Sequence, residues 1–226
     1  MTVSSPLSQL GQRILKRLTL ALCVAVGLMV VFVWIAKEMV EGRTTTFDRA
    51  ISLGLAEHHS AWWDAWMRAA TTMGEIWMIL VLVCGVAVWA FARKYAKLAV
   101  VLLVVNACSA GLNVALKHSF RRARPTLLDK FIAPDSYSFP SGHAMGSMVA
   151  YGMIAWVIGR MHPKLRAPAY IVAAFLITNI GLSRVYLGVH WFTDILAGFA
   201  AGGIMLAVVG VFARRTPEVK IADAEV

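Results

Sequence analysis

The chain has 226 residues, of which 59% are hydrophobic and 15% are charged, and its mean hydropathy is +0.70. A soluble domain carries far more charge, so this composition excludes an ordinary soluble protein. The formal net charge of +10 does not indicate a nucleic-acid partner, because no soluble basic domain is present to bind one.

Six uncharged apolar windows follow one another along the chain, each 16 to 19 residues long. A helix needs about 17–25 apolar residues to span the hydrocarbon of a bilayer. The shortest window reaches this length with Pro140–His143 as its first turn. A soluble protein would have no polar shell to cover six such runs, so the sequence predicts an all-α polytopic protein with six transmembrane helices. The windows are Thr19–Ala36, Ile76–Ala92, Leu98–Leu116, Ala144–Gly159, Ala167–Ser183 and Ile195–Ala213.

The first window could be mistaken for a secretory signal, because basic residues precede it. Its apolar run is too long for a signal core, and no small-x-small cleavage site follows it. We therefore expect an uncleaved first transmembrane helix and a single membrane-embedded domain over residues 1–226.

Short basic segments indicate which ends of the spans share a side of the membrane. They lie at both termini, between the second and third windows and between the fourth and fifth. Because cytoplasmic loops are enriched in Lys and Arg, all four are assigned to the cytoplasmic side of the inner (plasma) membrane, including the tails 1–17 and 214–226. The basic residues are Arg13, Lys16, Arg17, Arg93, Lys94, Lys97, Arg160, Lys164, Arg166, Arg214, Arg215 and Lys220.

The first connection on the opposite side, Lys37–Glu75, is predicted to be an interfacial helix and loop. Phe47, Ile51 and Leu55 recur at helical spacing after a Thr-rich cap and Asp48, which favours a plain helix on the membrane surface. Further along, Trp62, Trp63 and Trp66 fit an interfacial aromatic belt, and His58 and His59 are expected to be solvated.

The second and third outer connections carry three blocks of polar residues: "KHSFRRARP" at 117–125, "PSGH" at 140–143 and "SRVYLGVHWFTD" at 183–194. The topology brings Lys117, Arg124 and Arg184 to one membrane surface. Snorkelling explains one such cation, but it does not explain three beside two histidines and a carboxylate. Because Arg and Lys are the cations that bind phosphate, the pattern predicts an anion site.

The "PSGH" block is predicted to contribute a helix N-terminus to this site. Pro140 suits the first turn of a helix, and Ser141 and Gly142 would then present free backbone N–H groups to an anion. His190 and Asp194 are four residues apart, so we expect them on one helical face, where the carboxylate fixes the imidazole tautomer.

These blocks resemble the signature K-x6-RP, PSGH and SR-x5-H-x3-D of the type 2 phosphatidic acid phosphatase family. All fixed letters are present in order, and the likeness covers about residues 44–205. The resemblance implies an integral membrane lipid phosphatase in which His190, oriented by Asp194, attacks phosphorus to form a phosphohistidine. His143 would protonate the leaving oxygen and later activate water. The phosphate oxygens would be held by Lys117, Arg124, Ser141, Gly142 and Arg184.

No metal or other cofactor is expected, because the carboxylates on this side form no spaced cluster with the histidines that suits a two-metal site. The expected partners are the bilayer and a lipid phosphate, whose apolar part Leu127, Leu128, Phe131 and Ile132 would touch. Undecaprenyl pyrophosphate is the favoured substrate, because a site facing the periplasm or cell exterior is where that carrier is left after polymer export. The alternatives are phosphatidylglycerophosphate, phosphatidic acid and lipid A phosphates.

Two functions of other classes remain open on the sequence alone. A phosphate or lipid transporter could use the same cations, but its site would be expected near the membrane midplane. A silent membrane scaffold would have no need of intact His143, His190 and Asp194.

Overall fold

The computed structural model describes residues 6–126 and 136–212, and this described part is helical without a strand. The predicted all-α fold is therefore confirmed. The predictions on Leu127, Leu128, Phe131, Ile132, Arg214, Arg215 and Lys220 fall outside the described residues. The helices are α1 (Pro6–Val40), α2 (Thr45–Ala56), α3 (Ala61–Thr72), α4 (Ile76–Ala92), α5 (Ala96–Phe120), α6 (Gly142–Met161), the 3-10 turn Pro163–Leu165, α7 (Arg166–Tyr186) and α8 (Phe192–Phe212).

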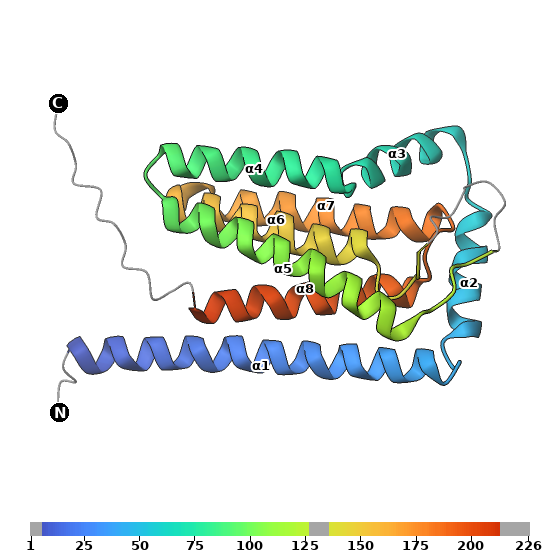
Figure 1. The fold of residues 1–226 in the computed structure, drawn as a ribbon, viewed down its shortest axis with the longest axis horizontal. Helices are drawn as coiled ribbons and strands as arrows, with labels where there is room; N and C mark the ends of the chain where they lie inside the picture. The colour runs from blue at the N-terminus through green and yellow to red at the C-terminus, as the bar shows by residue number, and fades with distance from the viewer. Residues whose placement is uncertain (1–5, 127–135, 213–226) are drawn as a thin grey trace.

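Helix α6 forms the centre of the bundle. It packs against α5, α7 and α8, while α1 runs along α8 (Figure 1). Glycines bring α8 close to α6, since a Cβ on Gly198 would lie 2.8 Å from the carbonyl oxygen of Ser141, and one on Gly202 would lie 3.0 Å from that of Met145. This packing holds the first half of α8 against the start of α6.

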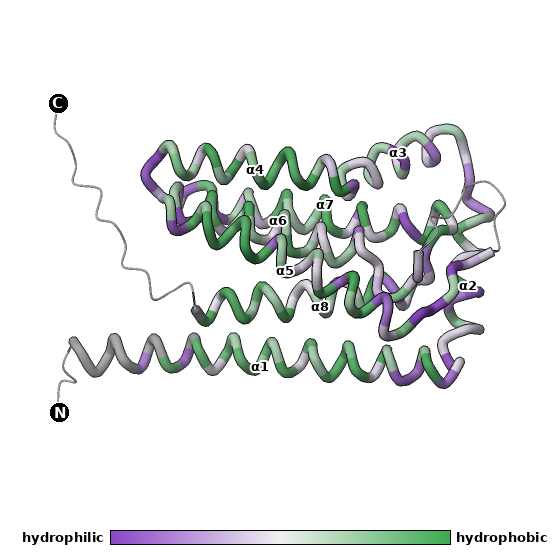
Figure 2. The backbone as a smooth tube through the Cα atoms, in the orientation of Figure 1, coloured by the Kyte–Doolittle hydropathy of each residue, from purple (hydrophilic) through white to green (hydrophobic). Residues whose placement is uncertain are grey.

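Five helices, α1 and α5 to α8, are long and apolar enough to cross a membrane. Helix α4, the remaining predicted span, has 17 residues and is counted together with α3, from which it is bent by 52°. Apolar residues recur along the length of these helices (Figure 2). Many of their side chains are exposed, such as Leu20 at 65% and Val88 at 69%. Five spans, or six with the bent pair, agree with the predicted polytopic protein.

The two ends of the bundle differ. The connections α4–α5 and α6–α7, which carry Arg93, Lys94 and Lys164, lie at one end (Figure 1). The connections α5–α6 and α7–α8, which carry the three sequence blocks, lie at the opposite end, together with α2 and α3 (Figure 1). The blocks therefore share one end of the molecule, as the order of spans predicted.

Helix α2 crosses this end of the bundle, and it is more than a surface helix (Figure 1). Asp48 and Ser52 on its inner face are buried, and α2 packs against α7 and α8. The interpretation as a plain membrane-surface helix is therefore wrong for this face. The reason is that Asp48 bonds the start of α8 through the Thr193 N–H at 2.9 Å.

The segment after α2 also differs from the expectation in part. His58 is exposed, as predicted. His59 is not solvated, because its Nδ1 lies 2.7 Å from Asp64 and its ring packs on Tyr186 at 4.3 Å. Trp62 on α3 is 63% exposed, which is typical of an interfacial aromatic belt.

Candidate active site

His190 and Asp194 meet at the start of α8, and both are buried. Oδ2 of Asp194 lies 3.3 Å from Nδ1 of His190 and accepts the N–H of Trp191 at 2.9 Å. The predicted contact is present, but the predicted shared helical face is not, because α8 begins only at Phe192. Asp194 reaches His190 by folding back over the first turn of the helix.

The contacts of His190 define its tautomer. Nη1 of Arg124 lies 3.0 Å from Nε2 of His190, and a guanidinium can only donate a hydrogen bond. Nε2 must therefore carry the lone pair, and Nδ1 carries the hydrogen that it donates to Asp194. Burial lowers the pKa of His190 to about 4 against the opposite pull of Asp194, so the ring is neutral at pH 7.

Three cations from three elements lie near this ring. Arg124, in the α5–α6 connection, contacts it. Lys117, in the last turn of α5, and Arg184, in the last turn of α7, lie close enough to Arg124 to interact with it electrostatically. Lys117 donates to the carbonyl of Tyr137, and Arg124 donates to that of Val189 at 2.7 Å. Burial also lowers the pKa of Arg124, although a guanidinium stays charged at neutral pH.

Arg184 has one hydrogen-bond donor without an acceptor among the described residues. Its Nη1 donates to Oγ1 of Thr71 at 2.6 Å, whereas its Nε is buried with no acceptor in the described part of the chain. A buried donor without a partner is costly. An oxygen of a bound phosphate would satisfy it.

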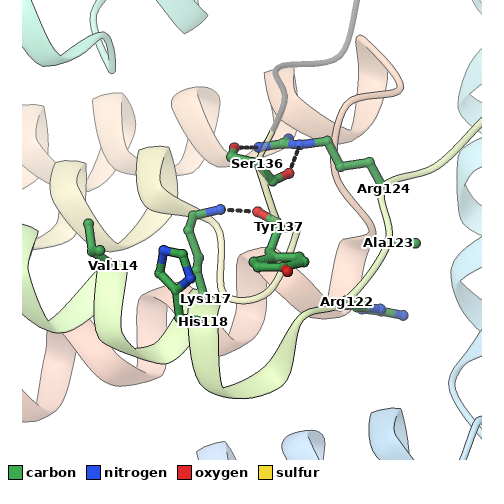
Figure 3. A pocket seen from close by; sticks show the side chains of 8 residues that line it. All are labelled: Val114, Lys117, His118, Arg122, Ala123, Arg124, Ser136 and Tyr137. Atoms are coloured by element: carbon green, nitrogen blue, oxygen red, sulfur yellow. Dashed lines mark hydrogen bonds between the residues drawn. The ribbon is translucent and has the colours of Figure 1, made fainter.

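A pocket of ≈ 570 Å³ opens beside two of these cations (Figure 3). Lys117 and Arg124 both point into it, toward Tyr137 and Ser136 respectively, and His118 and Arg122 lie at its wall (Figure 3). Lys117, Arg122 and Arg124 make the lining of the pocket basic, and neither His143 nor His190 belongs to that lining.

The start of α6 differs from the expectation in two respects. The helix begins at Gly142, so Pro140 lies before its first turn. Ser141 is the N-cap: its Oγ accepts the N–H of Ala144 at 3.4 Å, and its own N–H donates to the carbonyl of Asp194 at 3.0 Å. The N–H of Ser141 is therefore not free for phosphate, because it ties α6 to α8. Gly142 remains in the first turn, where N–H groups precede the intrahelical hydrogen bonds.

A buried charge network that the sequence did not predict lies behind Asp194. Arg122 donates to Oδ1 of Asp194 at 2.6 Å and to Oδ2 of Asp48 at 2.7 Å. Asp48 in turn accepts the hydroxyl of Thr193 at 2.7 Å. With Oδ1 held in this way and Ser138 donating to Oδ2, the carboxylate cannot rotate away from His190.

A second missed carboxylate contacts His143. Oε1 of Glu75, at the start of α4, lies 3.3 Å from Nε2 of His143. One sequence signal could have indicated Asp48, because Asp48 and Ser52 form a polar stripe beside the apolar one on α2. Glu75 gave no comparable signal. In the described part of the chain, no three His, Cys, Asp or Glu side chains are placed to hold a metal ion together.

Comparisons with known proteins identify similar sequences. The model of the PAP2 superfamily matches residues 94–217. Phosphatidylglycerophosphatase B of Bacillus subtilis is 30% identical over 190 residues, which are 83% of this chain and 93% of that protein. The undecaprenyl-diphosphatase of Sulfolobus acidocaldarius is 39% identical over 69 residues, 30% of each chain.

A solved structure is also similar. The crystal structure of a transmembrane PAP2 type phosphatidylglycerolphosphate phosphatase from Bacillus subtilis superposes with a TM-score of 0.81 at 30% identity. The match covers 87% of this chain and 98% of that one. The arrangement of the helices is therefore shared with that structure.

Proposed function

The chain belongs to the PAP2 superfamily and is a membrane lipid phosphatase, and from this premise we propose that it works through a phosphohistidine on His190. Nε2 of His190 attacks phosphorus, the bond from phosphorus to the leaving oxygen breaks, and His143 gives that oxygen a proton. Water then attacks phosphorus, His143 takes a proton from it, and the bond to Nε2 breaks. Both steps pass through a five-coordinate phosphorus with charge on its equatorial oxygens.

One observation carries this assignment: Nε2 of His190 faces Arg124 at 3.0 Å while Nδ1 faces Asp194. The nucleophilic lone pair therefore points to the cations that would hold the phosphate. Lys117, Arg124, Arg184 and the N–H of Gly142 supply donors to the equatorial oxygens, and they act most strongly where charge develops in the transition state. Ser141 contributes by capping α6 and not through its N–H.

For the substrate we propose a lipid phosphate monoester of the phosphatidylglycerophosphate type. The support is the relative of that name, which matches almost over its whole length. Undecaprenyl pyrophosphate, which the sequence argument favoured, is the second candidate, because a shorter stretch resembles an undecaprenyl-diphosphatase. The pocket beside Lys117 and Arg124 has room for the headgroup of either lipid.

A panel of lipid phosphates tests both the activity and the preference. The purified protein should release inorganic phosphate from phosphatidylglycerophosphate with a higher kcat/KM than from undecaprenyl pyrophosphate, phosphatidic acid or a lipid A phosphate. The release should continue in EDTA, because cations of the chain supply the positive charge. No release from any of these lipids would exclude the phosphatase and favour a transporter, while loss in EDTA with recovery in magnesium would contradict the metal-free mechanism.

We also propose that the site opens to the periplasm or cell exterior of the inner membrane, with both termini cytoplasmic. The basic loops with Arg93 and Lys164 lie at the end opposite the site, and such loops face the cytoplasm. In a variant without its natural cysteines, Ser136→Cys should react with an impermeant thiol reagent in intact spheroplasts. Lys164→Cys should react only after lysis. The reverse pattern would invert the topology.

A further inference from the structure

The corner between α3 and α4 lies directly against His143. The two helices are bent by 52° there, and the N–H of Gly74 closes the turn onto the carbonyl of Thr71 at 2.8 Å. A Cβ on Gly74 would lie 2.8 Å from Cδ2 of His143 and 2.5 Å from Cγ2 of Ile180. The absent side chain at Gly74 thus allows the corner to touch the imidazole.

This corner places the carboxylate of Glu75 on His143, with Oε1 3.3 Å from Nε2. The side chain of His143 is 16% exposed and that of Glu75 is 43% exposed, so the contact is accessible from the surface on the side of Glu75. No other carboxylate contacts His143 in the part of the chain that the structure describes. Asp194 is engaged by His190 and Arg122.

The other charged groups around His143 are positive. They are Lys117 from α5, Arg124 from the α5–α6 connection and Arg184 from α7, while the ring of His190 is neutral at pH 7. Positive neighbours disfavour the protonated imidazole, and a carboxylate favours it. A general acid must begin the reaction with its proton in place.

We propose that Glu75 is a positioning residue that keeps His143 protonated and oriented for proton transfer, a role that rests on the proposed function of His143. Nε2–H donates to Glu75, and Nδ1–H gives its proton to the leaving oxygen as the bond from phosphorus to that oxygen breaks. His143 is then neutral and keeps its hydrogen on Nε2. Nδ1 accepts the proton of the attacking water as the bond from phosphorus to His190 breaks, which restores the starting state.

The test compares two soluble phosphate monoesters that differ in their leaving group, an alkyl phosphate and an aryl phosphate. An alkoxide is a poor leaving group and needs the proton, whereas a phenolate of low pKa does not. In Glu75→Gln, kcat for the alkyl phosphate should fall about 100-fold, the lower end of general-acid effects, while kcat for the aryl phosphate should change by less than about threefold. Glu75→Asp should recover part of the loss, and Glu57→Gln, an exposed residue at the end of α2, is the matched control.

The pH dependence of kcat/KM gives a second readout. If the contact of Glu75 with His143 were purely structural, Glu75→Gln would not shift this dependence. Without the carboxylate His143 loses its proton more easily, so the alkaline limb of kcat/KM for the alkyl phosphate should move to lower pH by about one unit or more. Equal losses on both esters with an unmoved limb, or full activity of Glu75→Gln, would overturn the proposal. The His143→Ala variant separates failure of the Glu75 proposal from failure of the proposed function. If the activity that His143→Ala loses is the same for the alkyl and the aryl phosphate, the assignment of His143 as the general acid is itself wrong.

Discussion

Replacing His190 with alanine is expected to lower phosphate release by at least about a thousandfold, because the change removes the nucleophile that forms the covalent intermediate. The fold should persist, since Asp194 keeps Arg122, Ser138 and the N–H of Trp191 as partners. Turnover on the lipid panel and the unfolding temperature of the purified protein are the measurements. The exposed His58→Ala variant is the matched control and should keep normal activity.

Two further observations would distinguish a nucleophile from a merely essential histidine. Rapid quenching of the wild type with 32P-labelled substrate should trap an acid-labile, base-stable phosphoenzyme that His190→Ala does not form. Because the pKa of His190 is lowered to about 4, His190 should stay neutral and active well below pH 6.5 and lose its lone pair only near pH 4. An active His190→Ala variant would contradict the mechanism. So would a pH profile of the wild type whose activity falls on the acid side near pH 6.5 and not near pH 4.

Asp194→Asn should be nearly as damaging, with kcat lowered about 10²–10⁴-fold while the protein remains folded. The asparagine amide can donate to Nδ1 of His190, which shifts the ring hydrogen onto Nε2 and blocks the attacking atom. The shape of the side chain is retained, but the amide NH2 that faces His190 no longer accepts the N–H of Trp191, which donates to the same atom, Oδ2, in the wild type. The loss should therefore lie in kcat, with KM changed little.

The buried charge network requires a control, because Asp194→Asn also removes the negative charge that pairs with Arg122. Asp48→Asn weakens the same network from its other end without touching the ring of His190. If Asp194→Asn acts only through stability, both variants should lose unfolding temperature and activity in parallel. If the tautomer matters, Asp194→Asn should lose far more activity than Asp48→Asn at an equal loss of stability.

Much of this site follows from local sequence. The apolar windows fix the spans, and the order of spans brings Lys117, His143, Arg184 and His190 to one end of the bundle. Contact between His190 and Asp194 follows from their separation of four residues, even though the helix begins only at Phe192. These features can be predicted locally for two reasons. The α-helix repeats about every 3.6 residues, and successive connections of a chain that crosses a membrane must lie on alternate sides of it.

Tertiary structure alone decided the supporting contacts. Asp48 reaches Arg122, and Glu75 reaches His143, across 74 and 68 positions of sequence. Helical periodicity relates residues only within a few turns and does not say which face of one helix meets another. The N–H of Ser141, expected to be free for phosphate, is likewise taken by the carbonyl of Asp194, because the glycines of α8 let that helix approach α6 so closely. The sequence by itself determined which residues gather at the site, and the packing of the helices decided which of them hold one another in place.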